Sequence, residues 1–157
     1  MSDTVICRHI LEGKYDEIEL PSPINPEFTI ILNRILNLLF HDEEQDTYPL
    51  IDDLVNIYHD TAHLELLARI MFDYDTNLFR YVIKLRPELI SSGSYTVLHC
   101  AAQYHPSRLP MLFELGADIN KRIPGSGSTP LDKAFIMRQE ESIILLLKQG
   151  ANVMICN

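Results

Sequence analysis

Two short phrases in the second half of the chain recur at almost the same spacing. Residues 96–102, TVLHCAA, are followed 33 positions later by residues 129–134, TPLDKA. Residues 116–120, GADIN, are followed 34 positions later by residues 150–153, GANV. Self-similarity with a period in the low thirties is typical of helix pairs that stack on one another, because a single pair cannot bury its apolar face alone.

The spacing of apolar residues predicts helices throughout the chain. No stretch alternates apolar and polar residues in the manner of a half-buried strand, so we expect an all-α fold. Helix pairs should begin near Thr29, Thr61, Thr96 and Thr129. The predicted helices cover residues 2–20 (with a break at Gly13), 27–40, 48–59, 61–74, 76–85, 97–104, 107–115, a segment from Pro130, and 140–149.

Proline and glycine residues mark where the helices of the second half should begin and end. Ser107 as N-cap would place Pro110 in the first turn, where its missing amide removes no hydrogen bond. Pro130 suits a helix start, and Gly116 and Gly150 suit a left-handed C-cap. Residues 121–128, which lie between Gly116 and Pro130, predict a long exposed loop.

Length and charge narrow the class of protein. The 157 residues, 46% apolar, predict a single domain with its own core. The net charge of −9 disfavours nucleic acid and anionic membranes and favours a protein partner with a basic or apolar surface. Three widely spaced cysteines and an acidic start without an apolar run predict a cytoplasmic protein, with the nucleus or a host cell as alternatives.

The repeated phrases resemble the ankyrin repeat, whose pattern is Thr-Pro-Leu-His, two alanines, a leucine-rich second helix and Gly-Ala-Asp. Val97 replaces proline in the first phrase, and Asp132 and Phe135 replace histidine and the second alanine in the second. The resemblance covers residues 93–157, while residues 1–92 are similar only in rhythm. The matching residues are Thr96, Leu98, His99, Ala101, Ala102, Gly127, Thr129, Pro130, Leu131, Ala134, Leu145, Leu146, Leu147, Gly150 and Ala151.

The resemblance implies one ankyrin-like domain over residues 1–157, a solenoid of about four helix pairs with a divergent first half. It implies a non-catalytic adaptor, scaffold or inhibitor that binds another protein through its concave face and hairpin tips, without cofactor or metal. Ile136 and Met137 could instead be covered by a fifth unit or a dimer mate. The implied contact residues are Tyr95, Gln103, Tyr104, Ser126, Ser128, Ile136 and Met137.

An alternative is that the divergent first 92 residues carry the specific function, as an effector or complex subunit, and the repeats support them. An enzyme is disfavoured. His59 and His63 share a helix face but lack a third metal ligand, so we expect two partly exposed histidines. His99 is explained by the turn, where the Thr96 hydroxyl can bond the imidazole three residues on, rather than by a nucleophile pair with Cys100. Residues 125–128 lack the lysine of a phosphate-binding loop and predict a flexible hairpin tip.

Overall fold

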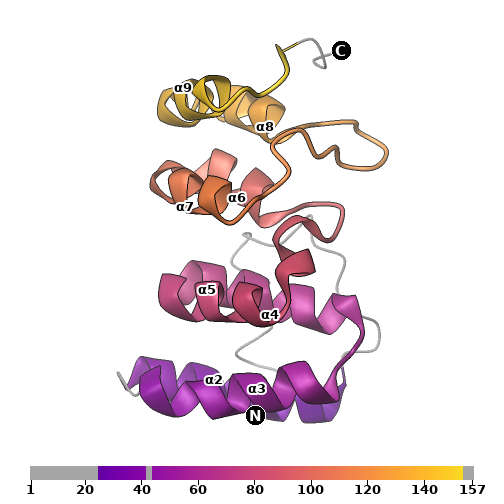
Figure 1. Cartoon of the computed structure of the whole chain (residues 1–157), viewed down its shortest axis with the longest axis vertical. Coiled ribbons are helices and arrows are strands. Elements are labelled where there is room, and N and C mark those ends of the chain that lie inside the picture. The colour runs from indigo at the N-terminus through magenta and orange to yellow at the C-terminus, as the bar shows by residue number, and fades with distance from the viewer. Residues whose placement is uncertain (1–24, 42–43, 154–157) are drawn as a thin grey trace. The chain divides into compact units, whose positions relative to one another are not determined.

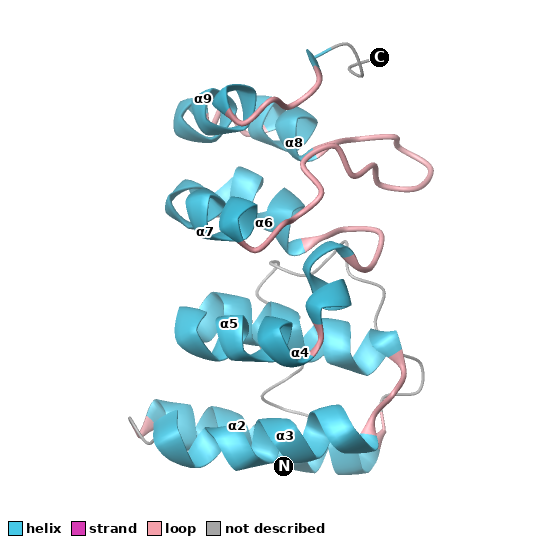
Figure 2. Ribbon diagram, in the orientation of Figure 1, coloured by secondary structure: helices cyan, strands magenta, loops and turns pink. Residues whose placement is uncertain are grey.

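The computed structural model describes residues 25–41 and 44–153, and every regular element within these ranges is a helix (Figure 2). This confirms the all-α prediction for the described part of the chain. The helix predicted over residues 2–20, together with Cys7 and Cys156, lies outside it. The chain divides into two compact units, residues 1–89 and 90–157. The boundary falls close to residue 93, where the sequence resemblance begins.

In the part of the first unit that the structure describes, the α-helices pack as two pairs (Figure 1). Helix α2 (Pro26–Phe40) packs on α3 (Tyr48–Ile57) and on the 3₁₀ helix η2 (Glu44–Thr47), and α4 (Thr61–Tyr74) packs on α5 (Thr76–Leu85). The 3₁₀ helix η3 (Pro87–Ser91) follows. The core is built from the apolar stripes of these helices. Its largest fully buried side chains include Phe28, Leu32, Ile35, Ile51, Leu54, Leu64, Leu67, Phe72 and Phe79.

Local signals set the helix boundaries of this unit. Asp60 caps α4, and the Asp75 carboxylate accepts the amides of Asn77 and Leu78 at the start of α5. Pro26, which the sequence placed outside a helix, is the first residue of α2, with Asn25 as its cap. A proline is accommodated there because the first amides of a helix have no internal partner.

A half-buried hydrogen bond joins the two pairs of the first unit. The Tyr81 hydroxyl of α5 donates to the Asp52 carboxylate of α3 at 2.7 Å. This bond to the protonated hydroxyl, together with burial and the negative charge of Asp52, raises the pKa of Tyr81. The link therefore favours the neutral tyrosine in the folded protein.

The second unit contains α6 (Val97–Tyr104), the 3₁₀ helix η4 (Pro106–Arg108), α7 (Leu109–Glu114), α8 (Pro130–Ile136) and α9 (Glu140–Lys148) (Figure 1). Within the unit, α8 packs against both α6 and α9, and α7 packs against α6 and α9. The loop between α7 and α8 projects away from the helices. The core is formed by residues at matching positions of the two repeats: Leu98, Ala101, Leu112, Leu131, Ala134 and Leu146.

The two phrases also share their backbone hydrogen bonds. Gly116 and Gly150 adopt φ values of 81° and 91°, which glycine reaches without strain. Each donates its amide to a carbonyl three residues back, and the next alanine donates five residues back, to Leu112 in one case and Leu146 in the other. This is the Schellman C-cap, and its recurrence shows that the sequence repeat is also a repeat of backbone structure.

One helix boundary of the second unit differs from the prediction, and one buried side chain lacks a polar partner in the part of the chain that the structure describes. Helix α7 begins at Leu109 with Arg108 as its N-cap residue, after a 3₁₀ turn, so Ser107 is not the cap. Pro110 still lies in the first turn, as predicted. In α9, Ser142 is fully buried, and its hydroxyl has no hydrogen-bond partner among the described residues. An unsatisfied buried hydroxyl costs stability, so Ser142 is a weak point of this core.

Candidate functional site

The start of α6 is fixed by a histidine that bonds in two directions. The His99 Nδ1 accepts the Thr96 amide at 3.2 Å and lies 2.9 Å from the Thr96 hydroxyl. The Nε2 atom therefore carries the proton of the neutral ring and donates to the Ser128 carbonyl at 3.3 Å. The predicted bond between the threonine and the imidazole is confirmed. Its second arm ties α6 to Ser128, two residues before α8 begins.

Asp132 reproduces only the local half of this arrangement in α8. Its carboxylate accepts the Thr129 amide at 2.8 Å and the Thr129 hydroxyl at 3.0 Å, while that hydroxyl accepts the Asp132 amide at 3.2 Å. These bonds form a reciprocal capping box. An ionised carboxylate only accepts hydrogen bonds and has no N–H with which to reach a carbonyl further along the chain. The aspartate therefore keeps the cap but cannot make the cross-link that histidine makes.

A chain of polar contacts connects three residues of the first phrase. The Tyr95 hydroxyl donates to the Gln103 side-chain oxygen at 2.6 Å, and the Gln103 amide donates to the Tyr104 hydroxyl at 2.9 Å. The Tyr95 ring stacks on His99, with ring centroids 5.4 Å apart. Tyr95 is only 6% exposed, although we expected it at the contact surface. Its ring is buried, and its hydroxyl holds the Gln103 side chain, which in turn contacts Tyr104.

Helix α8 presents side chains next to this group of α6 residues. Lys133, Ile136 and Met137 are spaced by three and four residues, so they share one face of the helix. The Lys133 ammonium lies 5.5 Å from the centroid of the Tyr95 ring, which places this face of α8 beside the Tyr95 contacts. We call the surface formed by Gln103, Tyr104, Lys133, Ile136 and Met137 the α6–α8 face.

Three side chains of the α6–α8 face expose large apolar or aromatic groups. The exposed fractions are 66% for Ile136 and 41% for both Met137 and Tyr104. No described residue covers Ile136.

The sequence did not predict a role for Gln139, whose side-chain amide donates to the Gln103 carbonyl at 3.2 Å and so links the segment after α8 to α6. No local pattern could have indicated this bond, because its partners are 36 positions apart.

The two predicted loop serines occupy different environments. Ser126 is exposed at the tip, and its hydroxyl accepts the Ser128 amide at 3.3 Å. The Ser128 carbonyl accepts hydrogen bonds from the Ile123 amide and from His99, so Ser128 belongs to the base of the hairpin. The structure thus brings Gln103, Tyr104, Ile136 and Met137 into one surface and places the two serines on the adjoining loop.

A second group of exposed apolar side chains lies on α9. Ile144 is 52% exposed and Leu147 is 41% exposed, and their spacing of three puts them on one side of the helix. Phe135, at the position matching the fully buried Ala102, is 48% exposed. The second unit therefore has exposed apolar groups on α8 and on α9, and experiments can compare the two.

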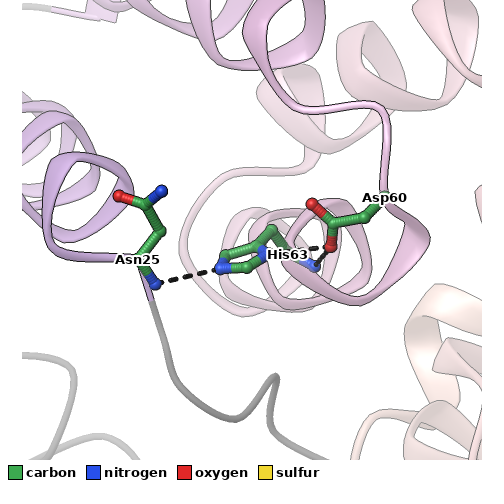
Figure 3. Close-up of polar contacts among 3 residues, drawn as sticks. All are labelled: Asn25, Asp60 and His63. Atoms are coloured by element: carbon green, nitrogen blue, oxygen red, sulfur yellow. Dashed lines mark hydrogen bonds and ion pairs between the residues drawn. The ribbon is translucent and has the colours of Figure 1, made fainter.

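In the first unit, a buried histidine bridges the starts of two helices (Figure 3). The His63 Nε2 accepts the Asn25 amide at 3.1 Å, and Nδ1 lies 2.7 Å from the Asp60 carboxylate. Since Nε2 is the acceptor, Nδ1 carries the proton and donates it to Asp60. His63 is 8% exposed, so the expectation of two partly exposed histidines is wrong for this residue, while His59 is exposed.

Asp60 serves both helix α4 and the histidine ring. Its carboxylate accepts the backbone amide of His63 at 3.1 Å as the N-cap, in addition to the ring bond. Burial acts to raise the pKa of Asp60, but the hydrogen bonds from the ring and the amide outweigh it and hold the pKa below its usual value. Both ring nitrogens of His63 are engaged within the protein, which gives the residue a structural role at the start of α2.

The chain was also compared with known proteins. Among the described residues, no helix is both long enough and apolar enough to cross a membrane. Searches of protein-family models, of curated proteins and of solved structures gave no match to this chain.

Proposed function

We propose that the second unit is a protein-binding module made of two ankyrin-like helix pairs, and that the α6–α8 face is its contact surface. The recurrence of the threonine caps and of the glycine C-caps, together with the packing of α6 on α8, supports the ankyrin-like assignment. In this assignment the chain is a non-catalytic adaptor, scaffold or inhibitor.

The observation that carries the proposal is the exposure of Ile136 and Met137 beside Tyr104 on a hydrogen-bonded frame. Exposed apolar groups gathered with a tyrosine are typical of protein interfaces. The frame is already ordered: the Tyr95–Gln103–Tyr104 contacts and the bond from Gln139 fix the side chains of α6 and the end of α8. A surface ordered in advance loses less entropy when a partner binds.

The test is affinity capture from a cell lysate followed by mass spectrometry, with the intact chain compared with Ile136→Ser/Met137→Ser. The matched control is Ile144→Ser/Leu147→Ser, which replaces two exposed apolar side chains on α9. Circular dichroism checks that both variants fold. We expect partners to be lost from the α8 variant and retained by the α9 variant. Equal capture by wild type and the α8 variant would contradict the proposal.

The same experiment addresses the alternative, in which the divergent first half carries the specific function. Residues 1–89 hold 17 acidic and 7 basic residues, a net charge of −10, which favours a basic partner for this unit. Partners that are retained by both variants and released by salt would support this alternative, because attraction between exposed charges is screened by ions.

A further inference from the structure

The charge of the chain is concentrated in one unit. Residues 1–89 carry a net charge of −10, whereas residues 90–157 hold 5 acidic and 6 basic residues, a net charge of +1. The acidity of the whole chain therefore describes the first unit. It does not describe the electrostatic environment of the α6–α8 face, which belongs to the second unit.

Taken together, the segments that build the α6–α8 face and the adjoining loop hold more basic than acidic residues. Residues 95–104 contain no Asp, Glu, Lys or Arg. Residues 119–139 contain four basic residues and a single carboxylate, Asp132, which accepts two hydrogen bonds from Thr129. The four basic residues are Lys121, Arg122, Lys133 and Arg138.

Two of these cations adjoin the exposed apolar side chains. Lys133 shares its helix face with Ile136 and Met137 and is half-buried against Tyr95, and Arg138 follows Met137 and is exposed. Carboxylates return only at Glu140 and Glu141, which are exposed in the first turn of α9, where the helix dipole already favours negative charge. Ile136 and Met137 thus lie in the sequence between two positively charged residues, Lys133 within α8 and Arg138 just after its C-cap.

We propose that the α6–α8 face binds a segment of a partner protein in which apolar side chains stand next to carboxylates. This inference rests on the proposed function and specifies the chemistry of its partner. The apolar side chains pack on Ile136, Met137 and Tyr104, and the carboxylates pair with Lys133 and Arg138. A basic segment would bring like charges together at the same positions, which opposes binding.

The experiment uses three fluorescent peptides of equal length in which leucine alternates with glutamate, with glutamine or with lysine. Fluorescence anisotropy measures their affinity for the intact chain. We expect the glutamate peptide to bind about tenfold more tightly than the glutamine peptide, and the lysine peptide to bind most weakly, since one well-placed charge pair is worth roughly a factor of ten. An equal or tighter affinity for the lysine peptide, or no binding of any peptide, overturns the inference.

Charge reversal locates the effect. Lys133→Glu/Arg138→Glu should change the preference from the glutamate peptide to the lysine peptide. If charge reversal at the half-buried Lys133 disturbs folding, Lys133→Gln/Arg138→Gln replaces it and should abolish the preference. Lys84→Glu/Lys148→Glu is the control, because it changes the net charge equally at exposed positions in the last turns of α5 and α9. A preference unchanged in both Lys133/Arg138 variants, or lost equally in the control, contradicts the inference.

The two proposals fail in different ways. If Ile136→Ser/Met137→Ser loses its captured partners while the peptides show no charge preference, the protein-binding function stands and the acidic character of the partner is refuted. If the α8 variant keeps all of its partners, the proposed function itself fails. The outcome of the peptide experiment alone therefore cannot be mistaken for a failure of the binding surface.

Discussion

His63→Ala tests how far one buried side chain stabilises the first unit. The substitution removes the acceptor for the Asn25 amide and the donor to Asp60. It also removes the edge-on contact of the ring with Phe28, whose centroid is 4.8 Å away, and its tilted contact with Tyr58, at 5.3 Å. Helix α2 thereby loses its side-chain link to the start of α4.

The expected cost follows from these contacts. A net hydrogen bond contributes about 1 kcal/mol, and the bond to Asp60 contributes less because that carboxylate is half exposed. The aromatic contacts contribute roughly 0.5–1.5 kcal/mol each. We therefore expect a loss of about 3 kcal/mol in the free energy of unfolding of the first unit, which corresponds to about a hundredfold change in its equilibrium constant.

Two further variants separate the causes. His63→Phe keeps a ring beside Phe28 and removes both nitrogen contacts, so it should recover about 1 kcal/mol of the loss. His59→Ala replaces an exposed histidine four residues earlier and should change stability by less than about 0.5 kcal/mol.

Hydrogen exchange followed by mass spectrometry provides the main measurement, with urea unfolding followed by circular dichroism beside it. Peptides covering the first turns of α2 and α4 should exchange about a hundredfold faster in His63→Ala, because opening of this region becomes that much more frequent. If His63→Ala and His59→Ala exchange at the same rate, the bridging role assigned to the ring is wrong.

Two other predictions concern single hydroxyl groups. The raised pKa of Tyr81 means that its neutral form stabilises the fold fully below the pKa of the unfolded tyrosine, near 10, and that this contribution is lost as the pH rises through the folded-state pKa. Asp52→Ala should therefore let one tyrosine ionise at lower pH. Absorbance of tyrosinate during alkaline titration measures this change, with Tyr81→Phe as the control. Ser142→Ala removes a buried hydroxyl without a partner among the described residues and should raise stability by up to about 1 kcal/mol in urea unfolding, and a clear loss would show that the hydroxyl is satisfied.

The sequence predicted those elements whose signals are local. The helices over residues 61–74, 76–85 and 97–104 have their predicted bounds, because a capping side chain precedes each apolar stripe or a proline follows it. The paired glycine caps at Gly116 and Gly150 were predictable for the same reason: a single residue type determines the backbone conformation there.

Features that depend on distant residues were not predictable. His63 was expected at a semi-exposed position, since nothing near it in the sequence shows that the Asn25 amide, 38 residues earlier, bonds to its ring. The burial of Tyr95 likewise depends on tertiary packing that includes Lys133, 38 residues later. Gln103, Tyr104, Ile136 and Met137 do lie on one surface, yet their role in binding stays a prediction.

The bond between His99 and the Ser128 carbonyl has a consequence for protein engineering. It anchors the descending arm of the α7–α8 hairpin at its root, whereas Gly125 and Ser126 at the apex are exposed. Foreign sequence inserted between these two apical residues leaves the anchor intact, while insertion beside Ser128 pulls the carbonyl away from the imidazole. An epitope or a reporter tag is therefore best inserted at the apex, where it leaves the packing of α8 on α6 unchanged.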